Sequence, residues 1–274
     1  MAGNFKSNKK LDVKWASMSL HWNNPIGDRF EPWLGAVKSV GYDGVSCFAE
    51  IVTDPFCDKA SSLNQALKNT GTELASIAIQ LNDTEEMFER TMNLMNETGC
   101  ENLICIAHGA NDKTPELYKH YAGLFNNIAE KSFARGICSH LHNNSDSIVR
   151  NFTDWSRMMP LIDWNKAFFM ADTGHATKDF DEKPHSECAV SFLDEHWDKL
   201  HYLEFKDFNE VTDLDTPLGE GFCDYPGIFD IMKERGYTGW ITIEQNQNSG
   251  LSLGRSPEEC ARISREFVRS GLGV

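Results

Sequence analysis

Side chains that can bind metal ions or move protons follow four short apolar runs in the second half of the chain. The four segments read His140-Leu141-His142-Asn143-Asn144, Asp172-Thr173-Gly174-His175, Glu204-Phe205-Lys206-Asp207 and Glu244-Gln245-Asn246. Each offers at least one carboxylate or imidazole, groups that commonly bind divalent cations or act as general acids and bases. If the fold brings these segments together, they predict a metal centre with acid–base chemistry.

The spacing within the segments indicates which side chains share a face. Side chains along a strand alternate with a period of two, so His140 and His142 point to the same side. Glu204 and Lys206 share a face for the same reason. The predicted metal ligands are one imidazole and three carboxylates: His140, Asp172, Glu204 and Glu244. Oxygen ligands with one imidazole and no cysteine suit Mn²⁺, Mg²⁺, Co²⁺ or Zn²⁺.

Candidates for acid–base chemistry are Glu244 from this set and three groups beside it. His142 comes first because an imidazole titrates near neutral pH, and His175 and Lys206 follow. Alternatives remain open, since His142 could lie behind the metal ligands or at the surface, and Lys206 could form a salt bridge with Asp207 or Glu220. The residues predicted to line a substrate pocket end the first four strands: His21, Trp22, Glu50, Gln80 and His108. Trp22 offers a ring face on which a sugar can stack.

Eight apolar runs typical of β-strands alternate with longer stretches typical of helices. The predicted strands are 13–19, 44–48, 73–79, 102–107, 136–142, 167–172, 201–206 and 240–244. The predicted helices are 30–40, 61–70, 84–98, 114–134, 145–158, 186–196, 225–235 and 257–270. This alternation predicts parallel βα units, and eight of them close into an α/β fold, the (β/α)₈ TIM barrel. Barrel active sites lie at the carboxyl ends of the strands, which is where the four polar segments fall.

Size and composition are consistent with one such barrel. The 274 residues, 41% hydrophobic and 24% charged, predict a single TIM-barrel domain over residues 1–274 without a linker. Residues 1–11 are polar and basic, and we expect them to form a flexible N-terminal extension. The eight cysteines are scattered without a Cys-x-x-Cys pair, which predicts reduced thiols in the core.

Charge and hydropathy disfavour several classes of partner. Forty-one acidic residues against 26 basic ones give a formal charge of -15, which repels nucleic-acid phosphates and anionic lipids. No apolar run approaches the roughly 18 residues of a membrane span, and no secretory signal is visible. We therefore expect a cytoplasmic protein that acts on a small molecule and binds neither nucleic acid nor a membrane.

Several motifs are similar to those of one barrel family. Besides the four polar segments, they are Trp22-Asn23-Asn24, Gly41-Tyr42-Asp43-Gly44, Leu218-Gly219-Glu220-Gly221 with Asp224, and Gly239-Trp240-Ile241-Thr242-Ile243-Glu244-Gln245. Over almost its whole length the chain resembles the xylose-isomerase-like barrels of sugar isomerases, epimerases and inosose dehydratases. The last motif and the closing segment 257–267 are most similar to the myo-inosose dehydratase branch.

The resemblance includes an exchange of residue types. Isomerases and epimerases of this family usually carry Glu on the fifth strand and His two residues before the Lys-Asp of the seventh. Here His140 and Glu204 stand at those positions, so the set still holds one His and three carboxylates. The family's epimerases use paired glutamates on opposite faces of the substrate, and this chain lacks the strand-five glutamate.

The resemblance implies a divalent-metal-dependent lyase, a dehydratase that eliminates a β-substituent from a keto-polyol or keto-sugar through a metal-stabilised enolate. Mn²⁺ is the expected ion, with Co²⁺, Mg²⁺ or Zn²⁺ as alternatives. A metal-dependent ketose isomerase or 3-epimerase is the first alternative function, and a non-catalytic sugar-binding barrel is the second. Association into a homo-oligomer is a further expectation from the family.

Overall fold

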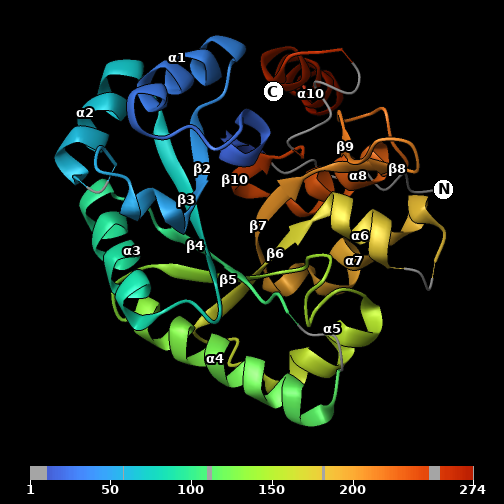
Figure 1. Ribbon diagram of the computed structural model, residues 1–274. Coiled ribbons are helices and arrows are strands. Elements are labelled where there is room, and N and C mark those ends of the chain that lie inside the picture. Colours follow the sequence, from blue (N-terminus) through green and yellow to red (C-terminus); the bar gives the residue numbers. More distant parts are fainter. Residues whose placement is uncertain (1–10, 58, 110–112, 181–182, 247–253, 274) are drawn as a thin grey trace.

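The apolar runs of the sequence form eight parallel strands that close into a barrel (Figure 1). The computed structural model describes residues 11–57, 59–109, 113–180, 183–246 and 254–273. The barrel strands are β1 (Asp12–Met18), β2 (Gly44–Phe48), β3 (Glu73–Gln80), β4 (Asn102–Ile106), β5 (Cys138–His142), β6 (Ala167–Asp172), β7 (Leu200–Phe205) and β10 (Thr238–Ile243). Around the barrel they follow the order β1-β10-β7-β6-β5-β4-β3-β2. The predicted TIM barrel is therefore confirmed.

Helices surround the barrel and cover the outer face of its strands (Figure 1). They are α1 (Phe30–Val40), α2 (Ala60–Thr70), α3 (Glu85–Thr98), α4 (Pro115–Phe133), α5 (Phe152–Met158), α6 (Thr173–Asp179), α7 (His185–His196), α8 (Tyr225–Arg235) and α10 (Pro257–Leu272). Short 3₁₀ turns are η1 (Ser19–Trp22), η2 (Gly27–Arg29), η3 (Ala49–Thr53), η4 (Met159–Leu161) and η5 (Trp197–Lys199). Side-chain caps fix several helix starts. The hydroxyl of Ser256, for example, accepts a hydrogen bond from the backbone N–H of Glu259 as α10 begins.

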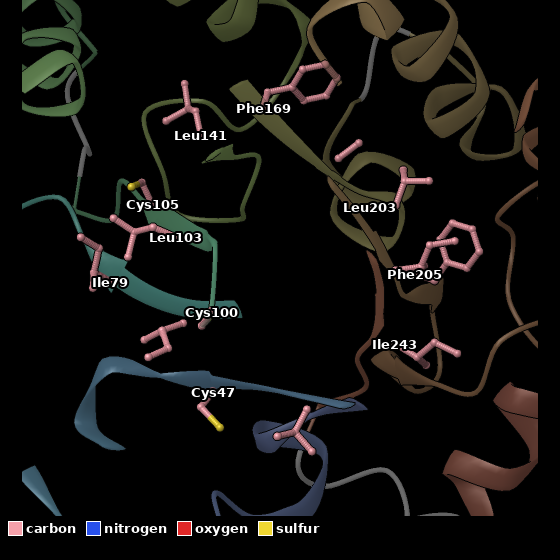
Figure 2. Packing of buried hydrophobic residues seen from close by; sticks show 14 of the residues in the cluster. Cys47, Ile79, Cys100, Leu103, Cys105, Leu141, Phe169, Leu203, Phe205 and Ile243 are labelled. Carbon is pink, nitrogen blue, oxygen red and sulfur yellow. The ribbon is translucent and has the colours of Figure 1, made fainter. Parts of the chain in front are cut away.

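Alternation along the strands separates the apolar core from the barrel interior. Buried side chains that pack between the strands and the helices include Leu103, Cys105, Leu141, Phe169, Leu203, Phe205 and Ile243 (Figure 2). Since neighbouring residues on a strand point to opposite faces, the residues between and beside them point into the barrel. The polar residues His142, Glu204 and Lys206 are among these. The same pattern that builds the core thus directs the charged groups inward.

The segment predicted as one helix over 145–158 is helical only from Phe152, so this prediction is wrong in its first half. The side chain of Asn151 accepts a hydrogen bond from the backbone N–H of Asp154 and caps the helix there. Before it, Asp146 has a left-handed backbone with a φ of 57°, which a helix does not accommodate. Ser147 instead forms an isolated bridge with His108. The first half of the segment is a loop beside the barrel mouth.

Two elements near the mouth were not predicted. Helix α6 follows β6 directly, with the carboxylate of Asp172 accepting a hydrogen bond from the His175 backbone N–H as its N-cap. A two-stranded antiparallel ribbon of β8 (Asp207–Asn209) and β9 (Asp213–Thr216) follows β7. Both elements begin at residues of the polar segments, where the sequence was interpreted as loop.

Predictions away from the barrel have mixed outcomes. The N-terminal extension expected for residues 1–11 lies outside the described residues except for Leu11, which packs against the core. All eight cysteines are free, and only Cys138 is not fully buried, which confirms the predicted thiols. No helix among the described residues has both the length and the apolar character needed to cross a membrane.

Candidate metal centre and active site

One imidazole and two carboxylates converge where β5, β6 and β7 end. His142 Nε2 lies 3.7 Å from Asp172 Oδ2 and 3.6 Å from Glu204 Oε1, and all three side chains are buried. His142 Nε2 has no hydrogen-bond partner among the described residues, and Asp172 Oδ2 has none besides its ion pair with Lys206, whose Nζ lies 3.2 Å away. Buried polar atoms are rarely left without a partner, so each such atom needs an explanation. Three converging donor atoms of these types are suited to a divalent cation.

Lys206 lies against this cluster and joins it to Glu244. The Nζ of Lys206 is 2.7 Å from Glu244 Oε1 and 3.2 Å from Asp172 Oδ2. It is also 3.8 Å from Glu204 Oε1. Burial alone lowers the pKa of Lys206, but the three carboxylates outweigh burial and raise the pKa above its ordinary value. Lys206 therefore stays protonated at neutral pH.

Three carboxylates and one ammonium group meet at the mouth. Fully ionised, Asp172, Glu204 and Glu244 would outnumber the one positive charge of Lys206 by two. Burial, reinforced by Glu244 and Asp172, raises the pKa of Glu204 well above its ordinary range. Burial also opposes ionisation of Asp172, but Lys206 and His175 hold its pKa well below the usual range. A divalent cation would neutralise the excess charge, so the residues present fit such an ion.

His142 is suited to a ligand position because it stays neutral. Burial lowers the pKa of its imidazole, despite the opposing effect of the nearby Asp172 carboxylate. A metal-binding histidine must be deprotonated at the ligating nitrogen, so a lowered pKa favours the binding form. The ring of His175 stands edge-on to His142, with centroids 5.8 Å apart.

His175 is held in one orientation by the loop before α5. The backbone N–H of Ser145 donates to its Nδ1 at 3.2 Å, and the Ser145 hydroxyl, 2.9 Å from the same nitrogen, also hydrogen-bonds Asp179. Because a backbone N–H can only donate, this contact makes Nδ1 an acceptor. The other ring nitrogen, Nε2, lies 3.4 Å from Nζ of Lys206 and 3.3 Å from Nδ2 of Asn144, which are donor groups as well. His175 is thus held in place between the Ser145 loop and Lys206.

His140, expected as the imidazole ligand, does not reach the cluster, and this placement corrects the sequence-based ligand set. It lies one layer deeper, where its Nε2 is 3.1 Å from Asn102 Oδ1 and its ring stacks on His201 at 5.2 Å. In the strand register His140 pairs with Phe168, near the start of β6, whereas Asp172 ends that strand. The imidazole beside the carboxylates is therefore His142, which the sequence indicated as an acid–base group. Glu244, also expected as a ligand, lies beside the cluster through its ion pair with Lys206.

Of the five residues predicted to line the substrate pocket, three line a cavity and two do not. His108 lines the central cavity, and Glu50 and Gln80 line a second cavity beside it. His21 is buried, with its Nε2 2.6 Å from the Pro257 carbonyl oxygen. Trp22 donates its indole N–H to Ser17 and packs against the core rather than offering a free face. The structure does not bring His21 or Trp22 to the described wall of either cavity.

The central cavity at the mouth has a volume of about 580 Å³ and two unlike walls. The polar wall carries His142, His175, Glu204, Lys206 and Glu244. The apolar wall carries Phe48, Ala78, Ile104 and Ile106 from β2, β3 and β4. Sequence reasoning missed the apolar wall because it followed polar residues alone. Strand parity could have found it, since Ile104 and Ile106 alternate with the core residues Leu103 and Cys105.

The fold and the site together define a class of protein: a (β/α)₈ barrel with an imidazole–carboxylate cluster at the carboxyl ends of its strands. The family model described as xylose isomerase-like TIM barrel matches residues 34–271. The chain belongs to this family, as its motifs predicted.

Known proteins that resemble the chain include an inosose dehydratase of Serratia proteamaculans (strain 568). It is 20% identical over 97% of this chain and 99% of its own length. Among solved structures, the probable 3-DHS dehydratase AsbF involved in petrobactin synthesis from Bacillus anthracis superposes with a TM-score of 0.73 at 13% identity, covering 93% of this chain and 98% of its own. A D-allulose 3-epimerase from Methylomonas sp. in complex with D-allulose gives a TM-score of 0.71 at 16% identity, covering 96% and 98%. These relatives are dehydratases and an epimerase that share the barrel.

Proposed function

We propose that this protein is a divalent-metal-dependent carbon–oxygen lyase that removes a β-substituent from a keto-polyol or keto-sugar. The observation that carries the proposal is the meeting of His142 Nε2, Asp172 Oδ2 and Glu204 Oε1 in a buried group, in which His142 Nε2 has no hydrogen-bond partner among the described residues. Similarity to inosose dehydratases over nearly the full length of both chains supports the same reaction class.

His142, Asp172 and Glu204 would hold the ion, with Mn²⁺ as the first choice and Co²⁺, Mg²⁺ or Zn²⁺ as alternatives. A bound divalent ion supplies Lewis-acid polarisation of a ketone oxygen, which makes the neighbouring C–H bond more acidic. Glu244 approaches the cluster from β10 and is joined to it by Lys206. It can complete the ligand set or act as a base.

The protonation states of the mouth suit elimination. Lys206 is held protonated by its carboxylate neighbours and is therefore an acid rather than a base. His175 Nε2 lies 3.4 Å from the Lys206 ammonium on the same side of the cavity. Glu244 is then the group of this set best placed to accept the α-proton, while Lys206 donates to the leaving oxygen.

Elimination is favoured over epimerisation because the carboxylates closest to the proposed metal site, Asp172, Glu204 and Glu244, lie on or just after neighbouring strands. Epimerisation needs a proton acceptor and a donor on opposite faces of one carbon. The wall that β4 contributes, across the barrel from β10, carries the apolar side chains of Ile104 and Ile106, with His108 just beyond the strand. Strand β5 contributes His142 to the mouth rather than a second carboxylate.

The test is to supply 2-keto-inositol to protein loaded with Mn²⁺ in deuterated water. We expect an enone absorbance to appear and deuterium to enter only alongside loss of water. Clean interconversion of two epimers, with deuterium at the epimerised carbon and no enone, would show an epimerase instead. Binding of sugar without turnover under any metal would show a non-catalytic barrel.

A further inference from the structure

A second cavity of about 520 Å³ adjoins the central one at the same end of the barrel. It lies among the segments that follow β1 and β2, next to the last residue of β3. Phe48 lines both cavities. Gln80, which lines the second cavity, places its Nε2 3.3 Å from Nδ1 of His108, which lines the first. The two spaces are therefore neighbours that share a boundary.

The walls of the second cavity are mostly apolar. They include Pro25, Ile26, Phe30, Phe48, Ile51 and Pro55. Ile26 leaves 45% of its surface exposed, which makes it one of few large hydrophobic residues exposed in the described part of the chain. An apolar hollow beside a catalytic cavity is suited to an apolar part of the substrate.

Part of this wall is preformed. The backbone N–H of Asn24 donates to the Ser19 carbonyl oxygen at 2.9 Å, and the Ser19 hydroxyl donates to the Asn24 side chain at 2.9 Å. Asn23 and Asn24 both have a left-handed backbone, with φ of 63° and 45°. Such conformations are uncommon outside glycine and persist where the surrounding contacts hold them.

Charge and hydrogen bonding narrow the chemistry of the occupant. No lysine or arginine occurs among the described residues that line the second cavity, whereas Glu50 and Asp54 do. A phosphate or carboxylate would therefore be repelled. Gln80 Oε1 is buried at the boundary and has no hydrogen-bond partner among the described residues. It can accept a hydrogen bond from a hydroxyl group.

We propose that the second cavity is a leaving-group subsite for an uncharged, largely apolar alcohol attached β to the ketone. This inference rests on the proposed lyase function. In the elimination the α C–H bond and the β C–O bond break, a C=C bond forms, and the leaving oxygen gains a proton. No oxidant or reductant is needed. Gln80 Oε1 would bind the new hydroxyl group only after that proton has been transferred.

The test uses two 3-keto-glucosides whose leaving groups differ in apolar size but not in intrinsic leaving ability, the methyl and the 2-cyclohexylethyl glycosides. Burial of the larger group should raise kcat/KM at least about 10-fold over the methyl compound. Ile26→Asp, at an exposed position that tolerates change, should bring the ratio of kcat/KM for the 2-cyclohexylethyl glycoside to kcat/KM for the methyl glycoside close to one. The methyl glycoside should still react at about the wild-type rate. Val211→Asp, at a residue 92% exposed on the ribbon turn, is the matched control and should leave the ratio unchanged.

Binding of 2-cyclohexylethanol alone, measured by calorimetry, separates the subsite from the reaction. The subsite is supported if the alcohol binds to the wild type and to Val211→Asp but not to Ile26→Asp. This result would stand even if no glycoside is cleaved, and only the lyase proposal would then fail. Conversely, if 2-keto-inositol or the methyl glycoside is turned over but the two glycosides react at equal rates, the subsite is overturned and the lyase proposal stands. Equal loss of both glycosides in Ile26→Asp would also overturn it.

Discussion

The middle layer of the barrel interior holds hydroxyl groups that bond to one another, whereas the layer above it holds charged groups that do not all find partners. In the middle layer, Ser46 Oγ lies 2.8 Å from Thr242 Oγ1 and accepts a hydrogen bond from Ser76 at 2.9 Å. Tyr202 Oη lies 2.8 Å from Thr242 Oγ1. Burial raises the pKa of Tyr202 to about 12, so this layer is neutral.

The upper layer contains buried ionisable side chains, namely His142, Asp172, Glu204, Lys206 and Glu244. His142 Nε2 lies 3.6–3.7 Å from the carboxylate oxygens of Asp172 and Glu204, too far for direct hydrogen bonds. A protein core usually satisfies its buried polar groups, as the middle layer does. The difference indicates that the middle layer maintains the barrel, while the upper layer accepts a ligand. Substitutions in the two layers should therefore affect different properties.

The largest effect is expected from Lys206→Met. This change leaves three buried carboxylates without their ammonium, and breaking a buried ion pair costs about 3–5 kcal/mol of unfolding free energy. If Lys206 is the acid, kcat should also fall by about 10²- to 10⁴-fold. Denaturant unfolding with and without Mn²⁺ measures the loss of unfolding free energy, and the metal should restore part of the lost stability.

Lys178→Met is the matched control for Lys206. Lys178 also lines the central cavity, but its Nζ pairs with Asp213 at the surface, 2.8 Å away. Exposed pairs contribute about 0–1 kcal/mol, so this variant should stay close to the wild type. If both variants lose stability equally, the buried charge cluster has no special role.

Glu204→Gln should reduce metal affinity by about 100-fold or more, because it removes a proposed ligand. Mutation of residues that only hold metal ligands in place already lowers metal affinity by about 10–100-fold. The metal-free variant should melt at a higher temperature than the metal-free wild type, since the neutral amide relieves repulsion from Asp172 and Glu244. Elemental analysis and thermal melts measure the two effects. Unchanged metal content would remove Glu204 from the ligand set.

Tyr202→Phe tests the middle layer. Loss of its hydrogen bond to Thr242 should lower the unfolding free energy by about 1 kcal/mol. Metal content and kcat should remain at the wild-type values, because the hydroxyl network does not reach the donor atoms of the cluster. A large loss of metal from this variant would show that the two layers are coupled.

An effect confined to acid pH concerns His21. Burial lowers the pKa of His21 below 6.5, although its contacts with the Pro257 carbonyl and Glu244 oppose this. The unfolded chain then binds more protons than the folded chain below pH 6.5, so stability is full above that pH and is lost as the pH falls through the window beneath it. His21→Gln should flatten this loss by up to about 1.4 kcal/mol per pH unit.

The sequence alone determined the barrel and the direction of its side chains. Each strand was predicted within two residues of its observed ends, because apolar alternation is a local property of the chain. The same alternation placed Glu204 and Lys206 on an inward face and Leu203 and Phe205 in the outer core. The helix start at Phe152 was missed because its cap, Asn151, lies within a run of residues that also suits a helix.

Only the tertiary structure decided which inward residues meet. His140 and His142 share one strand face, and the sequence could not tell which lies level with the carboxylates. That depends on the register between strands, where His142 pairs with Met170 and Asp172 with Glu204. Register is fixed by packing between distant parts of the chain and by the stagger of a closed barrel. A local pattern therefore gives the face of a residue, whereas its depth in the barrel is a property of the whole fold.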